Sequence, residues 1–344
     1  MSEAPFRERA AAAAGEGRGF VLRDGVLEVP GALRLHHGGE CRSLRVAWRL
    51  EGTDSAPVVV ALGGISAHRR VAAMPGQEPG WWQALVGIDL AVPLEHYRVL
   101  SFDYIGGNGG STGPSNGELF PSVSTYDQAD ALLRLLNHLG LRSVRAIVGA
   151  SYGGMVGLAF AERYPDRIER LAVISAADRP HPMATAWRSI QREVIRFALE
   201  QGEPARGVDI ARRLAMTTYR SAEEFSARFD SVAKQELGRF IFPVEHYLSA
   251  RGSEYTRRQT PESFLALSES IDLHRIDATS VQIPVLAIAI REDQLVPVSD
   301  MRAMAARLPR VQLHELSSVF GHDAFLKEAN QLRALLPAFL EVNP

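Results

Sequence analysis

Short apolar runs recur along this chain from about residue 44, and segments with helical periodicity separate them. A bounded apolar run of about four to eight residues is typical of a buried strand, whereas apolar positions three and four apart are typical of an amphipathic helix. The pattern predicts strands near 44–50, 57–62, 97–103, 144–149, 171–176, 283–290 and 311–316, and helices at 125–140, 154–164, 299–308 and 324–340. This alternation predicts an α/β fold with a mostly parallel sheet and helices on both faces.

The alternation stops between residues 178 and 281, where the chain is arginine-rich and helical in pattern, without a clear strand. We interpret 178–281 as a helical cap, a lid inserted into a core formed by 19–177 and 282–344. Basic and acidic residues are equally numerous in this cap, so an anion site there would be local rather than a broad basic face. Residues 1–18 are interpreted as a mobile N-terminal tail.

The composition is ordinary for a globular protein, with 344 residues, 46% hydrophobic and 23% charged positions, and a net charge of −2. This charge offers no electrostatic footprint for nucleic acid, and no apolar run is long enough to span a membrane. The single cysteine, Cys41, excludes an intramolecular disulfide and fits a cytoplasmic protein. Without cysteine clusters or an H-x-x-x-H or H-x-H spacing, we expect no metal site.

The five residues from Gly149 to Gly153, Gly-Ala-Ser-Tyr-Gly, follow an apolar run and precede a segment of small residues. A G-x-S-x-G segment between a strand and a helix is typical of a nucleophile elbow, whose tight turn needs glycine on both sides of the serine. Such a turn presents Ser151 beneath a helix N-terminus, whose N–H groups favour developing negative charge. The alternative for so short a motif is a turn without chemistry.

A reactive serine needs a histidine to take its proton, and the histidine needs a carboxylate to orient it. Asp293 comes directly after the apolar run that ends at Ile290, and His322 lies in a glycine-containing loop after the last predicted strand. No other histidine of the ten has such a position. Glu292 is the rival carboxylate, but Asp293 fits the usual strand–x–x–Asp–x–x–Val–Pro spacing. We therefore predict Ser151, Asp293 and His322 as the catalytic residues.

The chain order Ser, Asp, His is that of the α/β-hydrolase fold. Two backbone N–H groups hold the oxyanion that forms during acyl transfer in this fold. The residue after the nucleophile, Tyr152, supplies the first. The second comes from the loop after an early strand, where Leu62 is the candidate and Gly63 the alternative. An ordinary turn at Gly63-Gly64 is compatible with this role.

Several longer strings lie between Gly80 and Leu326. Thr-Tyr-Arg-Ser at 218–221 and Gly-His-Asp-Ala-Phe-Leu at 321–326 discriminate most, because generic esterases lack them. Further strings are Gly-Trp-Trp at 80–82, Val-Gly at 86–87, the glycine-rich 109–115, Phe-Pro-Ser-Val at 120–123, Met155, Ala-Met-Thr at 215–217, Val-Glu at 244–245 and Tyr-Leu at 247–248. Through them the chain resembles the homoserine O-acyltransferases of the α/β-hydrolase superfamily, and it departs from that family at Tyr152, His246 and 106–110.

The resemblance implies ping-pong transfer of an acyl group from acyl-coenzyme A, a co-substrate, to the γ-hydroxyl of L-homoserine, on the way to methionine. It also implies that Arg220 and Asp323 bind the amino acid, whose zwitterion needs both a cation and an anion. A surface salt bridge is the alternative for Arg220, and a helix cap is the alternative for Asp323. Family members are commonly homodimers paired through the cap, so we expect a homodimer. No bound cofactor is expected.

The second position after Asp293 bears on the acyl donor. Relatives that use succinyl-coenzyme A tend to have arginine there, which meets the carboxylate of the acyl group. This chain has Leu295, which favours acetyl-coenzyme A, although Arg291 could compensate and succinyl-coenzyme A stays open. L-Serine is the alternative acceptor. Outside the family, the rival interpretations are a plain esterase with the same triad and a non-enzymatic binding protein on this scaffold.

Overall fold

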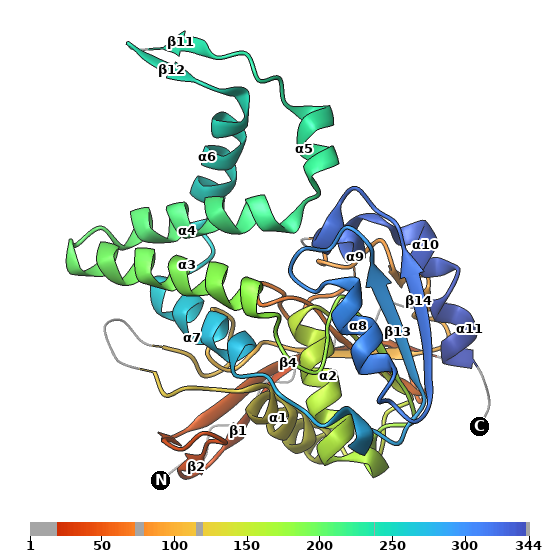
Figure 1. The fold of residues 1–344 in the computed structure, drawn as a ribbon. Helices are drawn as coiled ribbons and strands as arrows, with labels where there is room; N and C mark the ends of the chain where they lie inside the picture. Colours follow the sequence, from red (N-terminus) through yellow and green to blue (C-terminus); the bar gives the residue numbers. More distant parts are fainter. Residues whose placement is uncertain (1–18, 73–78, 115–119, 237, 342–344) are drawn as a thin grey trace.

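Figure 1 shows the fold in a computed structural model that describes residues 19–72, 79–114, 120–236 and 238–341. The expected tail, 1–18, lies outside the described residues. The central eight-stranded sheet has the spatial order β1 (Phe20–Val29), β4 (Leu44–Thr53), β8 (Arg98–Phe102), β5 (Val58–Leu62), β9 (Ala146–Ala150), β10 (Leu171–Ile174), β13 (Val285–Ile290) and β14 (Val311–Leu316). Neighbours from β8 to β14 are parallel, whereas β4 is antiparallel to both β1 and β8. The prediction of a mostly parallel sheet is confirmed.

Strand β5 illustrates how the sheet builds two cores, because successive side chains of a strand point to opposite faces. Its residues at 58, 60 and 62 pack in one apolar cluster, and those at 59 and 61 pack in the other. The first cluster includes side chains of α1 (Thr125–His138), α2 (Tyr152–Arg163) and α8 (Val298–Ala305). The second includes side chains of α9 (Ala324–Lys327), α10 (Ala329–Arg333) and α11 (Leu336–Glu341). Burial on both faces explains why the central strands read as continuous apolar runs.

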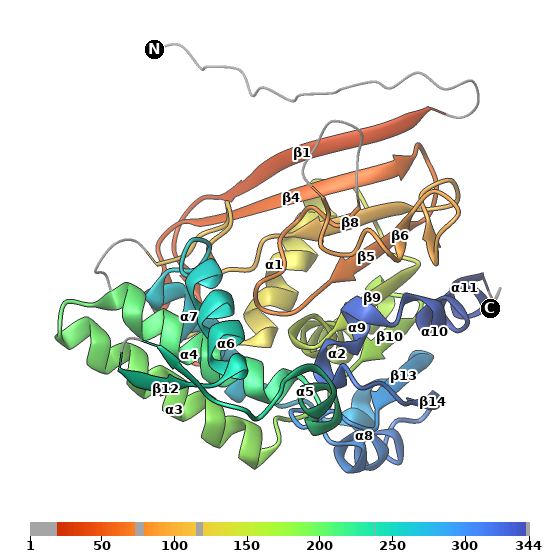
Figure 2. The same ribbon diagram turned by 90° about the horizontal axis from the view of Figure 1, so that it is seen from above.

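The sequence did not indicate β1, which forms one edge of the sheet in Figure 2. This strand pairs with β4 along its whole length, from Phe20 opposite Thr53 to Val29 opposite Leu44. Its apolar alternation is interrupted by Asp24, which is paired with Arg49 of β4 and with Arg69. Three minor strand pairs also went unpredicted, because the strands are only two or three residues long: β2 (Leu33–Arg34) with β3 (Glu40–Cys41), β6 (Val86–Gly87) with β7 (Val92–Pro93), and β11 (Lys234–Glu236) with β12 (Arg239–Ile241).

The single helix expected at 324–340 is wrong, because the structure divides this stretch into α9, α10 and α11. The first break falls at Glu328, whose ψ of 49° is incompatible with a continuous helix. Pro337 lies in the first turn of α11, where the missing N–H costs no hydrogen bond. The apolar spacing of the stretch is nevertheless retained, since Phe325, Leu332 and Leu336 all face the same cluster.

The described residues of 178–281 contain α3 (Pro182–Glu200), α4 (Pro204–Tyr219), α5 (Ala222–Arg228), α6 (Pro243–Tyr255) and α7 (Pro261–Asp272), together with the β11–β12 hairpin. Four of these helices begin with proline, which is preorganised for a first helical position. Side chains of α3, α4, α6 and α7 share a small apolar cluster of their own. In Figure 1 α3, α4 and α6 lie above β1 and β4, α7 lies below α3, and the hairpin projects away from the body. The exact boundaries between core and cap stay a prediction.

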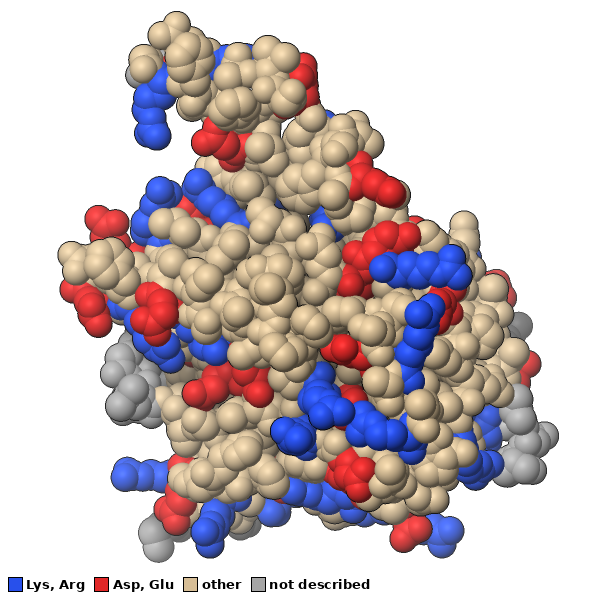
Figure 3. Space-filling view, in the orientation of Figure 1, with Lys and Arg blue, Asp and Glu red and all other residues tan. Residues whose placement is uncertain are grey.

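The surface carries no dominant charge on the face shown in Figure 3, where acidic and basic side chains are interspersed. Across the described ranges, no helix is both long and apolar enough to cross a bilayer.

The close contact between α2 and β5 gives a stability test at one glycine. A Cβ at Gly153 would overlap the backbone carbonyl of Leu62, whereas a Cβ at Gly157, on the same helix, would meet the flexible end of Leu171 at 2.7 Å. We expect Gly153→Ala to lower the free energy of unfolding by about 3 kcal/mol, because the backbone must shift. Gly157→Ala should stay within about 1 kcal/mol of the wild type, since alanine favours the helix. Urea denaturation measures both, and equal losses would contradict the close approach.

Candidate active site

Ser151 lies in a strained turn between β9 and α2. Its φ of 53° and ψ of −123° fall in a region that residues other than glycine rarely adopt. The flanking glycines allow this turn, because a Cβ at Gly149 would overlap the backbone of Gly153, and one at Gly153 would overlap that of Leu62. The N–H of Ser151 donates to the carbonyl of Ile174 in β10 at 2.8 Å. The backbone thereby holds the hydroxyl at the end of the sheet.

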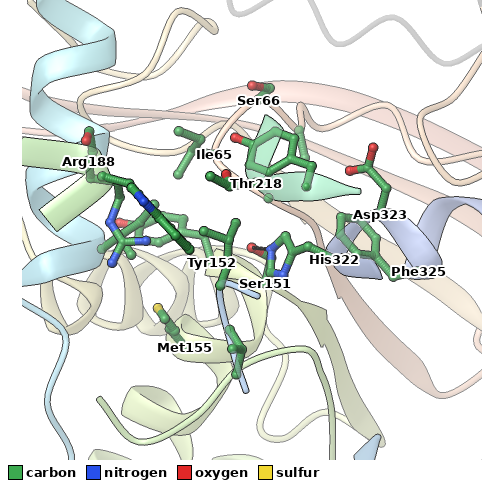
Figure 4. A pocket seen from close by; sticks show the side chains of 18 of the residues that line it. Ile65, Ser66, Ser151, Tyr152, Met155, Arg188, Thr218, His322, Asp323 and Phe325 are labelled. Atoms are coloured by element: carbon green, nitrogen blue, oxygen red, sulfur yellow. Dashed lines mark hydrogen bonds between the residues drawn. The ribbon is translucent and has the colours of Figure 1, made fainter. Parts of the chain in front are cut away.

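The structure brings Ser151, His322 and Asp293 into one hydrogen-bonded chain (Figure 4). Nε2 of His322 lies 2.8 Å from the hydroxyl of Ser151, and Nδ1 lies 2.7 Å from Oδ2 of Asp293. The other oxygen of Asp293 accepts from the N–H groups of Leu295 and Val296 at 2.9 and 3.0 Å. These bonds fix the carboxylate, so it can orient the imidazole and stabilise it when protonated.

The rival carboxylate, Glu292, points elsewhere. It accepts a hydrogen bond from the hydroxyl of Ser317 and one of 2.7 Å from the N–H of Ser318. Glu292 therefore anchors the loop that leads to His322, and the structure places Asp293 rather than Glu292 against the imidazole.

The pKa of His322 reflects two opposing effects. Burial lowers the pKa, because a protonated imidazole loses hydration, but the Asp293 carboxylate outweighs burial and holds the pKa above its ordinary value. Asp323 adds to the rise, whereas the positive charge of Arg188 opposes it. The histidine is thus well suited to receive the proton of Ser151.

The expected oxyanion donors lie on either side of a close backbone contact. Tyr152 is the first residue of α2, where N–H groups have no partner within the helix. Leu62 is the last residue of β5, and the next carbonyl, that of Gly63, accepts from the N–H of Gly153 at 2.9 Å. The side chain of Leu62 is buried in the core rather than exposed to the site. The roles of Leu62 and Tyr152, and of Gly63 as the alternative, stay predictions.

A cavity of about 200 Å³ opens at Ser151 and His322. The core contributes the loop 64–67 and Asp323, and the expected cap contributes side chains of α3, α4 and α7, among them Arg188, Arg212 and Ser268. A larger cavity of about 810 Å³ adjoins it and shares Arg212 and part of the loop 64–67. A hydrogen bond of 2.9 Å between the hydroxyls of Ser66 and Tyr255 joins the core to α6 beside both cavities.

Two residues are predicted to bind the amino-acid substrate. Asp323 lines the smaller cavity, and Arg220 lies behind Asp323. Nε of Arg220 donates to Asp323 at 3.0 Å, and Nη1 lies 3.6 Å from Glu224. The guanidinium is buried against Phe320, so this is no surface salt bridge. Asp323 precedes α9, but its side chain makes no helix-capping hydrogen bond. Direct contact of either residue with substrate stays a prediction.

Sequence reasoning missed Arg188 and Arg212, the two arginines that line the smaller cavity. The spacing of Arg188 and Arg192 places both on one helix face, which was a usable signal. Nothing in that spacing identified the opposing residue, Asp272, which is 84 positions away from Arg188.

The geometry predicts how the pH dependence of Ser151 should respond to its partners. Only a neutral imidazole accepts the proton, so in the wild type the labelling of Ser151 by a fluorophosphonate should rise through a midpoint above about pH 6.5. In Asp293→Asn the pKa of His322 should fall, moving the midpoint to lower pH, and the labelling rate should drop on the order of 10³- to 10⁴-fold. Glu292→Gln is the matched control and should keep the wild-type midpoint. A shifted midpoint in the control alone would refute the assignment.

Known proteins resemble this chain in sequence and in fold. Residues 57–329 match the model of the family described as the alpha/beta hydrolase fold. The homoserine O-succinyltransferase of Xanthomonas campestris pv. campestris is 42% identical over 310 residues, which are 90% of this chain and 82% of that protein. The homoserine O-acetyltransferase of Thermus thermophilus is 37% identical over 283 residues, which are 76% of this chain and 72% of that protein.

A solved structure, the homoserine O-acetyltransferase from Bacillus anthracis, superposes with a TM-score of 0.85 and covers 94% of this chain and 98% of that chain. Its sequence identity of 17% shows a shared fold alone. The similarity to the Xanthomonas and Thermus proteins extends over most of the chain. The chain therefore belongs to the homoserine O-acyltransferase family of the α/β-hydrolase superfamily.

Proposed function

We propose that this protein transfers the acyl group of an acyl-coenzyme A to the γ-hydroxyl of L-homoserine through a covalent intermediate on Ser151. The observation that carries the proposal is the hydrogen-bonded chain from Ser151 through His322 to Asp293, inside a cavity that the cap helices cover. Family membership supports the choice of acceptor.

In the first half-reaction His322 takes the proton of Ser151, and the serine oxygen attacks the thioester carbon. The carbon–sulfur bond then breaks, and the thiolate leaves with the proton from His322. The N–H groups of Tyr152 and Leu62 are proposed to stabilise the oxyanion in between. In the second half-reaction His322 takes the proton of the γ-hydroxyl, and that oxygen attacks the acyl carbon. The bond between the acyl carbon and the Ser151 oxygen then breaks, and His322 returns the proton to Ser151.

Asp323 is proposed to bind the ammonium of homoserine. Arg220, which donates a hydrogen bond to Asp323, would hold the Asp323 carboxylate in place from behind. Arg212 lies at the same end of the cavity, stacked over the rings of Tyr219 and Tyr255. It makes no ion pair with any carboxylate among the described residues, so it is available for the carboxylate of the amino acid. The larger cavity, with Arg251 and Arg258 on its wall, is the proposed entrance for the coenzyme A arm.

Three observations bear on the donor. Leu295 lines the cavity with an apolar side chain, which favours acetyl at that position. Arg291, which could have compensated, is 3.7 Å from Glu315 and lies outside the cavity lining. The Xanthomonas relative, however, is named a succinyltransferase, which favours a donor with a carboxylate.

The test is a matrix of acetyl- and succinyl-coenzyme A against L-homoserine and L-serine, followed by thiol release. We expect release to depend on homoserine, because the cavity restricts water and a bound hydroxyl is oriented for attack. Ser151→Ala should abolish both release and the acyl adduct seen by mass spectrometry. Thiol release that does not depend on the amino acid would instead support a plain esterase. Failure of a fluorophosphonate to label Ser151 in the wild type would support a non-enzymatic binding protein. A lasting acyl adduct in Ser151→Ala would refute the nucleophile.

The β11–β12 hairpin and its flanks are proposed to pair two copies of the chain. Val232, Phe240 and Phe242 are 63%, 70% and 42% exposed there, an unusual density of uncovered apolar side chains. The hairpin projects away from the rest of the molecule in Figure 1, so a second copy can reach it.

Replacing an apolar contact with a charge should separate such a dimer. We expect Phe240→Asp to elute as a monomer, with light scattering giving half of the wild-type mass, because an unpaired carboxylate is costly to bury. Ile88→Asp is the control, since Ile88 is 58% exposed but lies outside the cap. A wild-type monomer, or a dimer that survives the Phe240 change, would contradict the proposal.

A further inference from the structure

Arg188 is a charged residue that lines the same cavity as Ser151 and has no assigned role. It lies on α3 and lines the smaller cavity, and its side chain is only 11% exposed. The mechanism proposed above gives it no role. A buried guanidinium without sufficient hydrogen bonds is costly, so its partners indicate what the site is built to bind.

Asp272 of α7 is the partner of Arg188 and is also shared. Nε of Arg188 donates to it at 2.8 Å and Nη2 lies 2.6 Å away, while Nη1 of Arg192 donates to its other oxygen at 2.6 Å. Thr185 donates a further hydrogen bond at 2.8 Å. One carboxylate thus faces two guanidinium groups, and these three charges sum to +1.

The guanidinium of Arg188 retains donor capacity toward the cavity. Its Nε and the buried Nη2 both face Asp272, whereas Nη1 makes no hydrogen bond or ion pair with any described residue. Across the described residues, Asp272 supplies every hydrogen bond and ion pair that Arg188 makes. A planar fork with unused N–H groups is suited to a carboxylate.

The position of Arg188 relative to Ser151 indicates which carboxylate Arg188 would bind. In Figure 4, Ser151 and His322 lie between Arg188 on one side and Asp323 on the other. The ammonium and carboxylate of an amino acid share one carbon, so both belong at the Asp323 end, where Arg212 also lies. An anion that reaches Arg188 must therefore belong to the acyl group on Ser151.

We propose that Arg188 binds the terminal carboxylate of the acyl group, so that the preferred donor is a dicarboxylic monoacyl-coenzyme A such as succinyl-coenzyme A. The inference rests on the proposed acyl transfer and narrows it. Arg188 then takes the place of the arginine that Leu295 does not provide. This proposal departs from the expectation of acetyl transfer, which rests on that one position, because the cap supplies a cation from another element.

Four proteins test the inference by thiol release with L-homoserine: the wild type, Arg188→Met, Arg188→Lys and the control Arg192→Met. The wild type should prefer succinyl- over acetyl-coenzyme A in kcat/KM by at least about tenfold. Arg188→Met should lower that preference by about 10- to 100-fold, the range expected for a charged hydrogen bond. Arg192→Met removes the other cationic partner of Asp272, and Arg192 does not itself line the cavity, so the preference of this variant should match the wild type.

Each outcome bears on a distinct claim. A wild-type preference for acetyl-coenzyme A, or an equal loss of preference in Arg188→Met and Arg192→Met, would overturn the role of Arg188 and leave acyl transfer intact. Release with neither donor would overturn the proposed function itself. If Arg188→Met fails to fold, Arg188→Lys answers the question, because it keeps the charge but not the fork and should retain an intermediate preference.

Discussion

The site depends on the backbone turn at Ser151, which is possible only because the residues at 149 and 153 are glycines. Because Gly149 and Gly153 have no Cβ, α2 can begin directly against the end of β5, and Ser151 is held at a positive φ. Strain of this kind persists only where the surrounding structure enforces it. Here two hydrogen bonds do so, from the N–H of Ser151 to Ile174 in β10 and from the N–H of Gly153 to Gly63, directly after β5.

The parallel sheet then brings residues that are distant in the sequence together at one edge. Parallel strands have their carboxyl ends at one edge, so the loops after β9, β13 and β14 meet there. His322 is 171 positions from Ser151 and 29 from Asp293, yet it contacts both. The nucleophile and its two partners thus lie in loops at the end of the sheet, while side chains of α3, α4 and α7 contribute walls and charges around them.

Sequence alone predicted what local pattern and chain order determine. The buried central strands are continuous apolar runs, and the elbow, Asp293 and His322 follow from spacing relative to those runs. Strand β1 escaped prediction because an edge strand needs less apolar alternation, and its charged Asp24 is satisfied only by arginines far along the chain. The division of the last helix depends on the backbone conformation at Glu328, which composition does not specify. The charges of the cavity wall depend on how α3 meets α7, a contact that no periodicity encodes.

The ion cluster of Arg188, Arg192 and Asp272 has one more consequence, because it fastens α3 to α7 as well as facing the cavity. A mutation that retunes the acyl preference at this wall would also loosen the join between two cap helices. A change of substrate range in this family would therefore require compensating changes elsewhere in the cap. New specificities should arise most readily from ancestors whose free energy of unfolding exceeds what folding requires.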